Sequence, residues 1–316
     1  MTSLIGKNVG SYRLLATTQL GESGFVYKAL HLEKRQTYAL KLLRGVLTAE
    51  NALQRKFLDK LRMAERLDHP HISRTYPTET TEDLSIVPLE FVYGQNVSRK
   101  IAEGASTVDF ALRLALQTAE ALQCAHAENT IHGCLTSNNL ILCADDDIKV
   151  VDFGLDAIPE EMLFPESDSA SGITAFSVPT RPPLSRFAYR APEQIQGEPA
   201  SSRSDLFSVG VILYELLAGE FLFEGDNRAE LDRQIQSREL PKISEVRPGA
   251  GAGWTKILRA LLEKNPANRY PSTQALLEDL RKLNYGLKVD RLSFQTTQPP
   301  LSRRSFFRRF VGEIED

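Results

Sequence analysis

The chain has 316 residues, a mass of 35.3 kDa, 42% hydrophobic residues and a formal net charge of −3. This size and apolar content suffice for one large domain or two lobes with a core. The sequence pI of about 6.0 argues against a protein that binds nucleic acid over its whole surface, which needs a basic footprint.

Short runs of apolar and aromatic residues open the chain. They occupy residues 12–15, 25–30 and 37–43, with turn or charged segments between them, and they predict antiparallel strands. A further run at 84–92 predicts one more strand. Its Pro88 removes a donor from the hydrogen-bond ladder, so we expect this proline at a strand end or a bulge.

Residues 48–67 have the period of an amphipathic helix. Four apolar residues follow the helical spacing and would form one buried stripe, namely Leu53, Phe57, Leu61 and Ala64. This region therefore predicts a long helix between the third and fourth strands.

The second half of the chain is mainly helical in pattern. Residues 109–126 carry an apolar stripe, and 207–217 are apolar almost throughout, which predicts a buried helix. Between them, 155–190 is rich in Ser, Thr and Pro, so we expect an irregular segment there. A last helix is predicted from the apolar residues Leu276, Leu277, Leu280 and Leu283.

Several short motifs follow one another in a fixed order. They are YALK (38–41), HGCLTSNN (132–139), DFG (152–154), APE (191–193), DLFSVG (205–210) and NPANRY (265–270). In this order they resemble the V-A-I-K, H-R-D-L-x-x-x-N, D-F-G and A-P-E motifs of protein kinases. The resemblance covers about residues 12–285. It implies a bilobal α+β fold, with a small lobe (12–90) of an antiparallel sheet plus one long helix, and a large, mostly helical lobe (91–285).

The same resemblance implies a site for ATP and Mg²⁺ between the lobes. It assigns the phosphate contact to Lys41 and the metal to Asn139 and Asp152. The other nucleotide contacts that it implies are Gly21, Gly24, Val26, Ala39, Leu89 (the gatekeeper), Glu90, Val92 and Ile141. Alternatives stay open at this point: Lys41 could be a solvated strand lysine, and Asn139 and Asp152 could merely brace their loop.

Two features of the small lobe depart from the family pattern. The glycine-rich turn has Ser23 at the second glycine position and about two residues fewer before Val26, so it should hold the phosphates less closely. The helical Glu that pairs with Lys41 in kinases falls on Lys60. Two ammonium groups near 4 Å repel by about 1 kcal/mol in water and about 4 kcal/mol at an effective dielectric constant of 20, so we expect the ion pair to be missing. Alternatively, Lys60 points to solvent and the helix lies further out.

The catalytic loop of the family is the most altered motif. Cys134 stands where kinases carry the Asp that accepts the proton of the substrate hydroxyl. Gly133, Thr136 and Ser137 replace the Arg, Lys and Pro of the family, and Arg186 falls where a Thr braces the catalytic Asp. Because a free thiol has a pKa of about 8.5, Cys134 should be neutral at pH 7 and a poor proton acceptor. A redox role would need a lowered pKa that the sequence does not supply.

Three further contacts implied by the resemblance are scaffold. We expect His132 to pack under Phe153, Asp205 to bind the backbone of the catalytic loop, and Glu193 to form a buried pair with Arg269.

These features favour a Ser/Thr-kinase-like pseudokinase that binds ATP weakly and acts in signalling through a protein partner. The alternative is an atypical active Ser/Thr kinase that transfers the γ-phosphate of ATP to protein hydroxyls, since Lys41, Asn139 and Asp152 are kept. A nucleotide-free scaffold is a third possibility, which the short flap favours. Each of these predicts a protein partner or protein substrate and no nucleic acid.

The two ends of the chain carry weaker signals. Residues 1–10 lack the basic and apolar regions of a signal peptide, and three cysteines give no disulfide framework, so a cytoplasmic location is expected. Residues 286–316 lie outside the resemblance. Within them, 302–310 interleaves four arginines with three phenylalanines, which would suit a membrane surface or a docking helix. A solvated or packed tail is the simpler interpretation.

Overall fold

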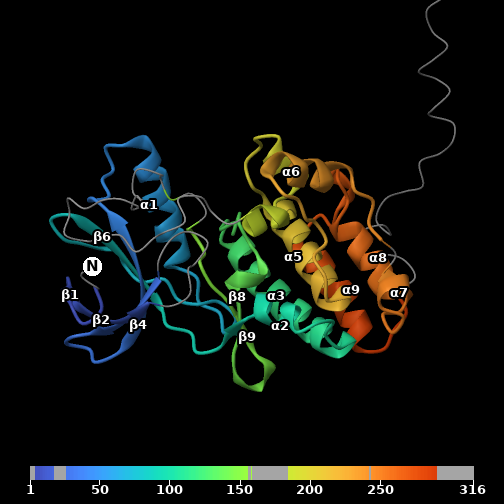
Figure 1. Cartoon of the computed structure of the whole chain (residues 1–316), viewed down its shortest axis with the longest axis horizontal. Coiled ribbons are helices and arrows are strands. Elements are labelled where there is room, and N and C mark those ends of the chain that lie inside the picture. Colours follow the sequence, from blue (N-terminus) through green and yellow to red (C-terminus); the bar gives the residue numbers. More distant parts are fainter. Residues whose placement is uncertain (1–3, 18–25, 156–157, 159–183, 242, 290–316) are drawn as a thin grey trace, which may run out of the picture.

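The computed structural model describes residues 4–17, 26–155, 158, 184–241 and 243–289. In this part the chain forms two lobes, a sheet with one helix and a larger helical bundle (Figure 1). The predicted α+β fold with two unlike lobes is confirmed. The tail segment 302–310 lies outside the described residues.

The small lobe is a curled antiparallel sheet with the strand order β1-β2-β3-β4-β6-β5. Its strands are β1 (Asn8–Val9), β2 (Tyr12–Thr17), β3 (Val26–His31), β4 (Thr37–Arg44), β5 (Glu79–Thr80) and β6 (Leu84–Glu90). Leu14, Ala29 and Leu40 are fully buried in a cluster on one face of this sheet. On the other face, Leu43 and Val87 pack with Phe57 and Leu61 of the helix α1 (Ala52–Ala64).

The helix α1 is shorter than the predicted helix at both ends. The side chain of Asn51 accepts hydrogen bonds from the backbone N–H groups of Leu53 and Gln54, and this cap fixes where the helix begins. The expected apolar stripe was wrong at Leu53, whose side chain is 62% exposed. Burial in α1 starts one turn later, at Phe57.

Pro88 lies inside β6 and not at a strand end, so that prediction was wrong. It pairs with Leu40 of β4, and its carbonyl accepts a hydrogen bond from the N–H of Tyr76 on the side away from β4. Because the N and O of one strand residue point to the same side, the missing N–H also faces away from β4. The β4–β6 ladder therefore loses no hydrogen bond.

The large lobe is built around two long helices, α3 (Val108–Ala127) and α5 (Ser202–Ala218). Nearly every residue of α5 is buried, as its apolar sequence predicts. The remaining helices are α2 (Val97–Ala102), α4 (Pro192–Ile195), α6 (Arg228–Ser237), α7 (Ile243–Val246), α8 (Ala252–Leu261) and α9 (Thr273–Asn284), and a small sheet consists of β7 (Gln95–Asn96), β8 (Leu140–Leu142) and β9 (Ile148–Val150). Figure 1 shows this small sheet at the junction of the lobes. No described helix combines the length and the apolarity that crossing a bilayer requires.

Candidate functional site

The sheet places four predicted nucleotide contacts on one face. Val26 of β3 pairs with Lys41 of β4, and Ala39 of β4 pairs with Leu89 of β6. Directly paired residues share a face of a sheet, as do residues two apart on a strand. Leu89 packs in the cluster that contains residues of α1, so this is the face that α1 covers. Lys41 is only 1% exposed, so it is not the solvated strand lysine that the sequence left open.

The link between the lobes includes Glu90 and Val92, two predicted nucleotide contacts. The carboxylate of Glu90 binds Lys149 at 2.9 Å, and the backbone N–H of Glu90 donates to the carbonyl of Arg74 at 2.8 Å. Within the described part of the chain, neither the N–H nor the C=O of Val92 has a hydrogen-bond partner. Val92 can therefore receive a planar ligand with both kinds of group, whereas Glu90 is engaged in structure.

Gly94 is a residue of this link that sequence reasoning missed. A Cβ at Gly94 would lie 2.2 Å from the carbonyl oxygen of Leu142 and 2.8 Å from Cγ2 of Ile141. Only glycine lets the link approach β8 this closely, so Gly94 permits the link to lie against Ile141, another predicted nucleotide contact. The sequence signal was a single glycine four residues after Glu90, too weak to interpret alone.

The segment after the DFG motif packs directly against α1. A Cβ at Gly154, whose φ is +79°, would lie 3.0 Å from the backbone oxygen of Lys60. Leu155 is 1% exposed and packs in the cluster of Leu89 and Phe57. At the position of Lys60 the helix therefore lies close to the site, contrary to the alternative of a helix displaced outward.

The backbone of the catalytic loop is held by Asp205 of α5. This carboxylate accepts hydrogen bonds from the N–H groups of His132 at 2.9 Å and Gly133 at 2.8 Å, and it also contacts His126 at 2.8 Å. The ring of His132 lies edge-on to Phe153 with centroids 4.8 Å apart. Both predicted scaffold contacts are confirmed.

Cys134 lies at the tip of this loop with a half-buried side chain. Its Sγ is 3.9 Å from Nδ1 of His132. Cys134 is also close enough to Arg190 to affect the pKa of that guanidinium. The position that the resemblance assigns to the catalytic base therefore carries a thiol close to an imidazole ring.

Asn139 and Asp152 come together as the predicted metal residues should. Nδ2 of Asn139 donates to Oδ2 of Asp152 at 3.3 Å, and Asp152 adopts a left-handed φ of +71° that directs it there. Oδ1 of Asn139, however, accepts two hydrogen bonds from Thr136, from its N–H and its hydroxyl, each at 3.0 Å. Because a carbonyl oxygen has two lone pairs, Thr136 occupies the oxygen that a metal ion would need.

A buried hydrogen-bond chain links the catalytic loop to α5. The hydroxyls of Ser137 and Tyr189 are 2.8 Å apart, and Tyr189 donates to Oε2 of Glu215 at 2.7 Å. Glu215 is fully buried, and this burial raises its pKa to about 7 although the bond from Tyr189 acts in the opposite direction. The sequence predicted only that the helix around Glu215 is buried and gave no role to this carboxylate.

We expect Glu215→Gln to flatten the dependence of stability on pH. Between the ordinary pKa of 4.5 and about 7, folded Glu215 keeps its proton while the unfolded chain releases it. The unfolded state then binds fewer protons, so the stability of the wild type should fall with rising pH by about 1.4 kcal/mol per unit, in total on the order of 3 kcal/mol. Urea unfolding at pH 5, 6, 7 and 8 measures this slope. Glu120→Gln is the matched control because the side chain of Glu120 on α3 is 36% exposed, and an unchanged slope in Glu215→Gln would contradict the assignment.

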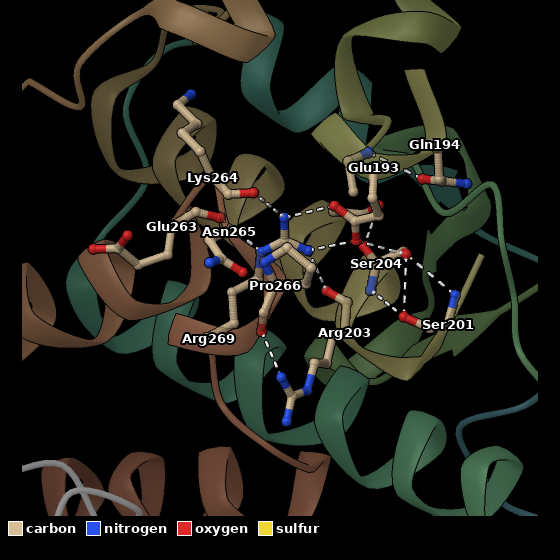
Figure 2. Close-up of polar contacts among 12 residues, drawn as sticks. Glu193, Gln194, Ser201, Arg203, Ser204, Glu263, Lys264, Asn265, Pro266 and Arg269 are labelled. Carbon is tan, nitrogen blue, oxygen red and sulfur yellow. Dashed lines mark hydrogen bonds and ion pairs between the residues drawn. The ribbon is translucent and has the colours of Figure 1, made fainter. Parts of the chain in front are cut away.

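The predicted pair of Glu193 and Arg269 is confirmed, and it is more extensive than predicted (Figure 2). The two guanidinium NH groups of Arg269 reach the two carboxylate oxygens of Glu193 at 2.7 Å each. The other N–H groups of Arg269 donate to the carbonyls of Glu263, Arg203 and Lys264. Burial raises the pKa of Glu193, but the hydrogen bonds and charge of Arg269 outweigh it and hold this pKa below its ordinary value.

Two predicted nucleotide contacts cannot be placed. Gly21 and Gly24 of the glycine-rich turn lie outside the described residues, as does most of the segment 155–190. The structure thus brings together Val26, Ala39, Lys41 and Leu89 on the sheet, and Asn139 with Asp152 on the loops. These form the candidate site.

Comparisons with known proteins agree with this architecture. A family model described as "Protein kinase domain" matches residues 16–280. The crystal structure of the Mycobacterium tuberculosis PknI kinase domain superposes on this chain with a TM-score of 0.66 and 22% sequence identity. The superposition covers 89% of this chain and 99% of that chain. Two variants of the same domain give TM-scores of 0.66 and 0.64. At this identity the likeness concerns the fold.

The chain also resembles bacterial kinases in sequence. It is 26% identical to the probable serine/threonine-protein kinase CPE1738 of Clostridium perfringens over 89% of this chain and 39% of that protein. It is 26% identical to PrkC of Bacillus subtilis over 88% of this chain and 41% of that protein. It is 28% identical to PknB of Mycobacterium tuberculosis over 87% of this chain and 43% of that protein. The chain thus spans about two fifths of the length of these serine/threonine-protein kinases. With the family model matched across residues 16–280, the chain belongs to the protein kinase family.

Proposed function

We propose that this kinase domain is impaired in phosphoryl transfer and acts in signalling by binding a protein partner. The observation that carries the proposal is the thiol of Cys134 at the position of the catalytic base, with its Sγ 3.9 Å from Nδ1 of His132. A positioned general base contributes about 10²–10⁴ in rate. A thiol accepts a proton from a substrate hydroxyl far less readily than a carboxylate does.

A nucleotide fits the site better than its metal ion does. The ammonium group of Lys41 on the buried sheet face suits the phosphates of ATP. The backbone N–H and C=O of Val92, which have no partner among the described residues, suit adenine. The carboxylate of Asp152 suits Mg²⁺. Asn139 could bind the metal only after the hydroxyl of Thr136 releases its oxygen. Among the described residues no group of three or more metal-binding side chains occurs, so the phosphates of ATP would have to complete the shell. We therefore propose weak, Mg²⁺-dependent ATP binding.

Thr136→Val is expected to strengthen Mg²⁺-dependent ATP binding. The substitution removes the hydroxyl donor and frees one lone pair of Asn139 for the metal. One hydrogen bond has a net value of about 0.5–1.5 kcal/mol, so the affinity should rise by about 2- to 10-fold. Calorimetric titration with ATP, with and without Mg²⁺, measures it.

The control for this variant is Thr118→Val, because the hydroxyl of Thr118 is buried without a partner in the described structure. Its affinity should match that of the wild type. An equal or lower affinity in Thr136→Val would show that Thr136 does not restrain the metal ligand.

An atypical active Ser/Thr kinase is the second candidate, favoured by the contact of Asn139 with Asp152. Phosphoryl transfer passes through a loose transition state that depends mainly on positioning and charge, so slow turnover without a strong base is chemically feasible. Incubation with radiolabelled ATP, Mg²⁺ and generic protein acceptors distinguishes the impaired domain from the active kinase. The Lys41→Ala variant serves as the blank that gives the background label. Label at the level of the blank supports the impaired domain, and label well above it supports the kinase.

The remaining expectations complete the proposal. We propose residues 12–285 as the kinase-like unit and the cytoplasm as its location, where the free thiols of Cys124, Cys134 and Cys143 would stay reduced. Its partner or substrate is a protein and not a nucleic acid. Contact of the 286–316 tail with a membrane stays a prediction.

A further inference from the structure

We infer that the surface formed by Phe187, Arg190 and Arg228 beside Cys134 binds an anionic side chain, a phosphate or a carboxylate, of a peptide segment of the partner. We call it the arginine surface. This inference rests on the proposed function, because it names the kind of partner that the impaired site would hold. The anionic group of the partner would enter the site where the substrate hydroxyl enters in an active kinase.

One aromatic ring organises the arginine surface. The guanidinium of Arg228 lies over the ring of Phe187 with its carbon 3.8 Å from the centroid, and Arg190 lies 5.8 Å from the same centroid. Arg228 opens the helix α6, and Arg190 directly precedes the APE motif at the end of a short 3-10 helix, Leu184–Tyr189. Such cation–π contacts hold the planar groups in fixed orientations without consuming their N–H donors.

Among the described residues, positive charge exceeds negative charge at this surface. Burial lowers the pKa of Arg190, and the nearby guanidinium groups of Arg228 and Arg186 lower it further. The carboxylate that acts on Arg190 is Asp232, which already binds Arg228 at 2.6 Å. Glu230, also in the first turn of α6, lies 3.8 Å from Arg233. Cationic groups held together in this way are stabilised by an incoming anion.

The chemistry and place of the surface define its ligand. Two guanidinium forks near one another match the oxygens of a phosphate or carboxylate, which arginine binds in a bidentate manner. The segment that carries Arg190 lies against the catalytic loop, because the N–H of Ala191 donates to Oε1 of Gln194 at 3.0 Å and Nε2 of Gln194 donates to the carbonyl of Gly133 at 2.8 Å. The anion would therefore lie close to the loop that carries Cys134. An unmodified serine carries no charge for the two arginines to bind. Clustered arginines commonly recognise phosphorylated or acidic peptide motifs.

Binding of fluorescein-labelled peptide pools tests the inference. Each pool has degenerate flanks and one fixed central residue, which is Ser, phosphoserine, Glu, Gln or Arg. Fluorescence anisotropy of the full chain without ATP should give affinities for the phosphoserine or Glu pool at least about tenfold above the Ser and Gln pools. The phosphoserine and Glu pools distinguish the two sources of the anion.

Two variants and a matched control assign the effect to this surface. Arg190→Gln and Arg228→Gln should each remove about tenfold of that preference, and Arg233→Gln on the same helix, with a side chain 74% exposed, should leave it unchanged. Thermal melts confirm that each variant folds, and Arg228→Gln decides the matter if Arg190→Gln does not fold. Equal binding of all pools, or equal loss in Arg233→Gln, would overturn the inference. Since ATP is absent, the result is independent of the transfer assay that tests the proposed function.

Discussion

Replacing Cys134 by aspartate is expected to raise phosphoryl transfer by about 10²-fold or more, because it restores a general base worth about 10²–10⁴ in rate. The loop that carries residue 134 is already held in place by Asp205 through the N–H groups of His132 and Gly133. An aspartate with an ordinary pKa of about 3.9 is ionised at pH 7 and can accept the proton. Initial rates of label transfer from radiolabelled ATP with Mg²⁺ measure the gain.

Cys134→Asn is the control for this gain, since asparagine has the shape of aspartate but does not accept the proton. We expect its rate to equal that of the wild type. If Cys134→Asp is no faster than Cys134→Asn, the missing base is not what limits this domain. Lys60 and the hydroxyl of Thr136 would then be the next features to change.

Arg269→Ala is expected to destabilise the fold by about 3–5 kcal/mol, since breaking one partner of a buried ion pair leaves the other charge uncompensated. The side chain of Arg269 has no exposed surface, and Glu193 would lose both 2.7 Å contacts (Figure 2). Three backbone carbonyls would also lose their donor. Domains are stable by only about 5–15 kcal/mol, so this is a large fraction. Urea unfolding at pH 7 measures the loss.

Arg281→Ala provides the comparison on the surface. Arg281 pairs with Glu120 at 3.3 Å, but its side chain is 46% exposed, and such pairs contribute about 0–1 kcal/mol. The two variants remove the same side chain and differ in burial. A loss below about 1 kcal/mol in Arg269→Ala would mean that the buried network does not hold the APE segment in place.

The sequence was sufficient to predict the fold because its motifs occur in one order. The period of 109–126 and the apolar run of 207–217 matched α3 and α5, and the contacts of Asp205 and Arg269 followed from the family resemblance. Apolar spacing alone does not show where a helix is capped. The predicted helix was therefore longer than α1, and Leu53 was expected to be buried although it is exposed.

The chemical details of the site depended on contacts that no motif contains. That the hydroxyl of Thr136 binds Asn139 follows from the loop geometry, and sequence reasoning noted only the loss of a lysine there. Gly94 is required by the distance to Leu142, and the convergence of Arg190 and Arg228 on Phe187 joins positions that are 38 residues apart in the chain. Such contacts depend on tertiary packing, and one sequence carries no signal for them.

The most direct test of the central claim compares the Mg²⁺-dependent rate of phosphate transfer by the wild type with that of Asp152→Ala. Asp152, which contacts Asn139, is the carboxylate that we propose for the metal ion, so its loss should abolish any genuine kinase activity. We predict that the two rates are equal within error, because we propose that the wild type lacks an effective base. Robust transfer by the wild type that disappears in Asp152→Ala would contradict the account.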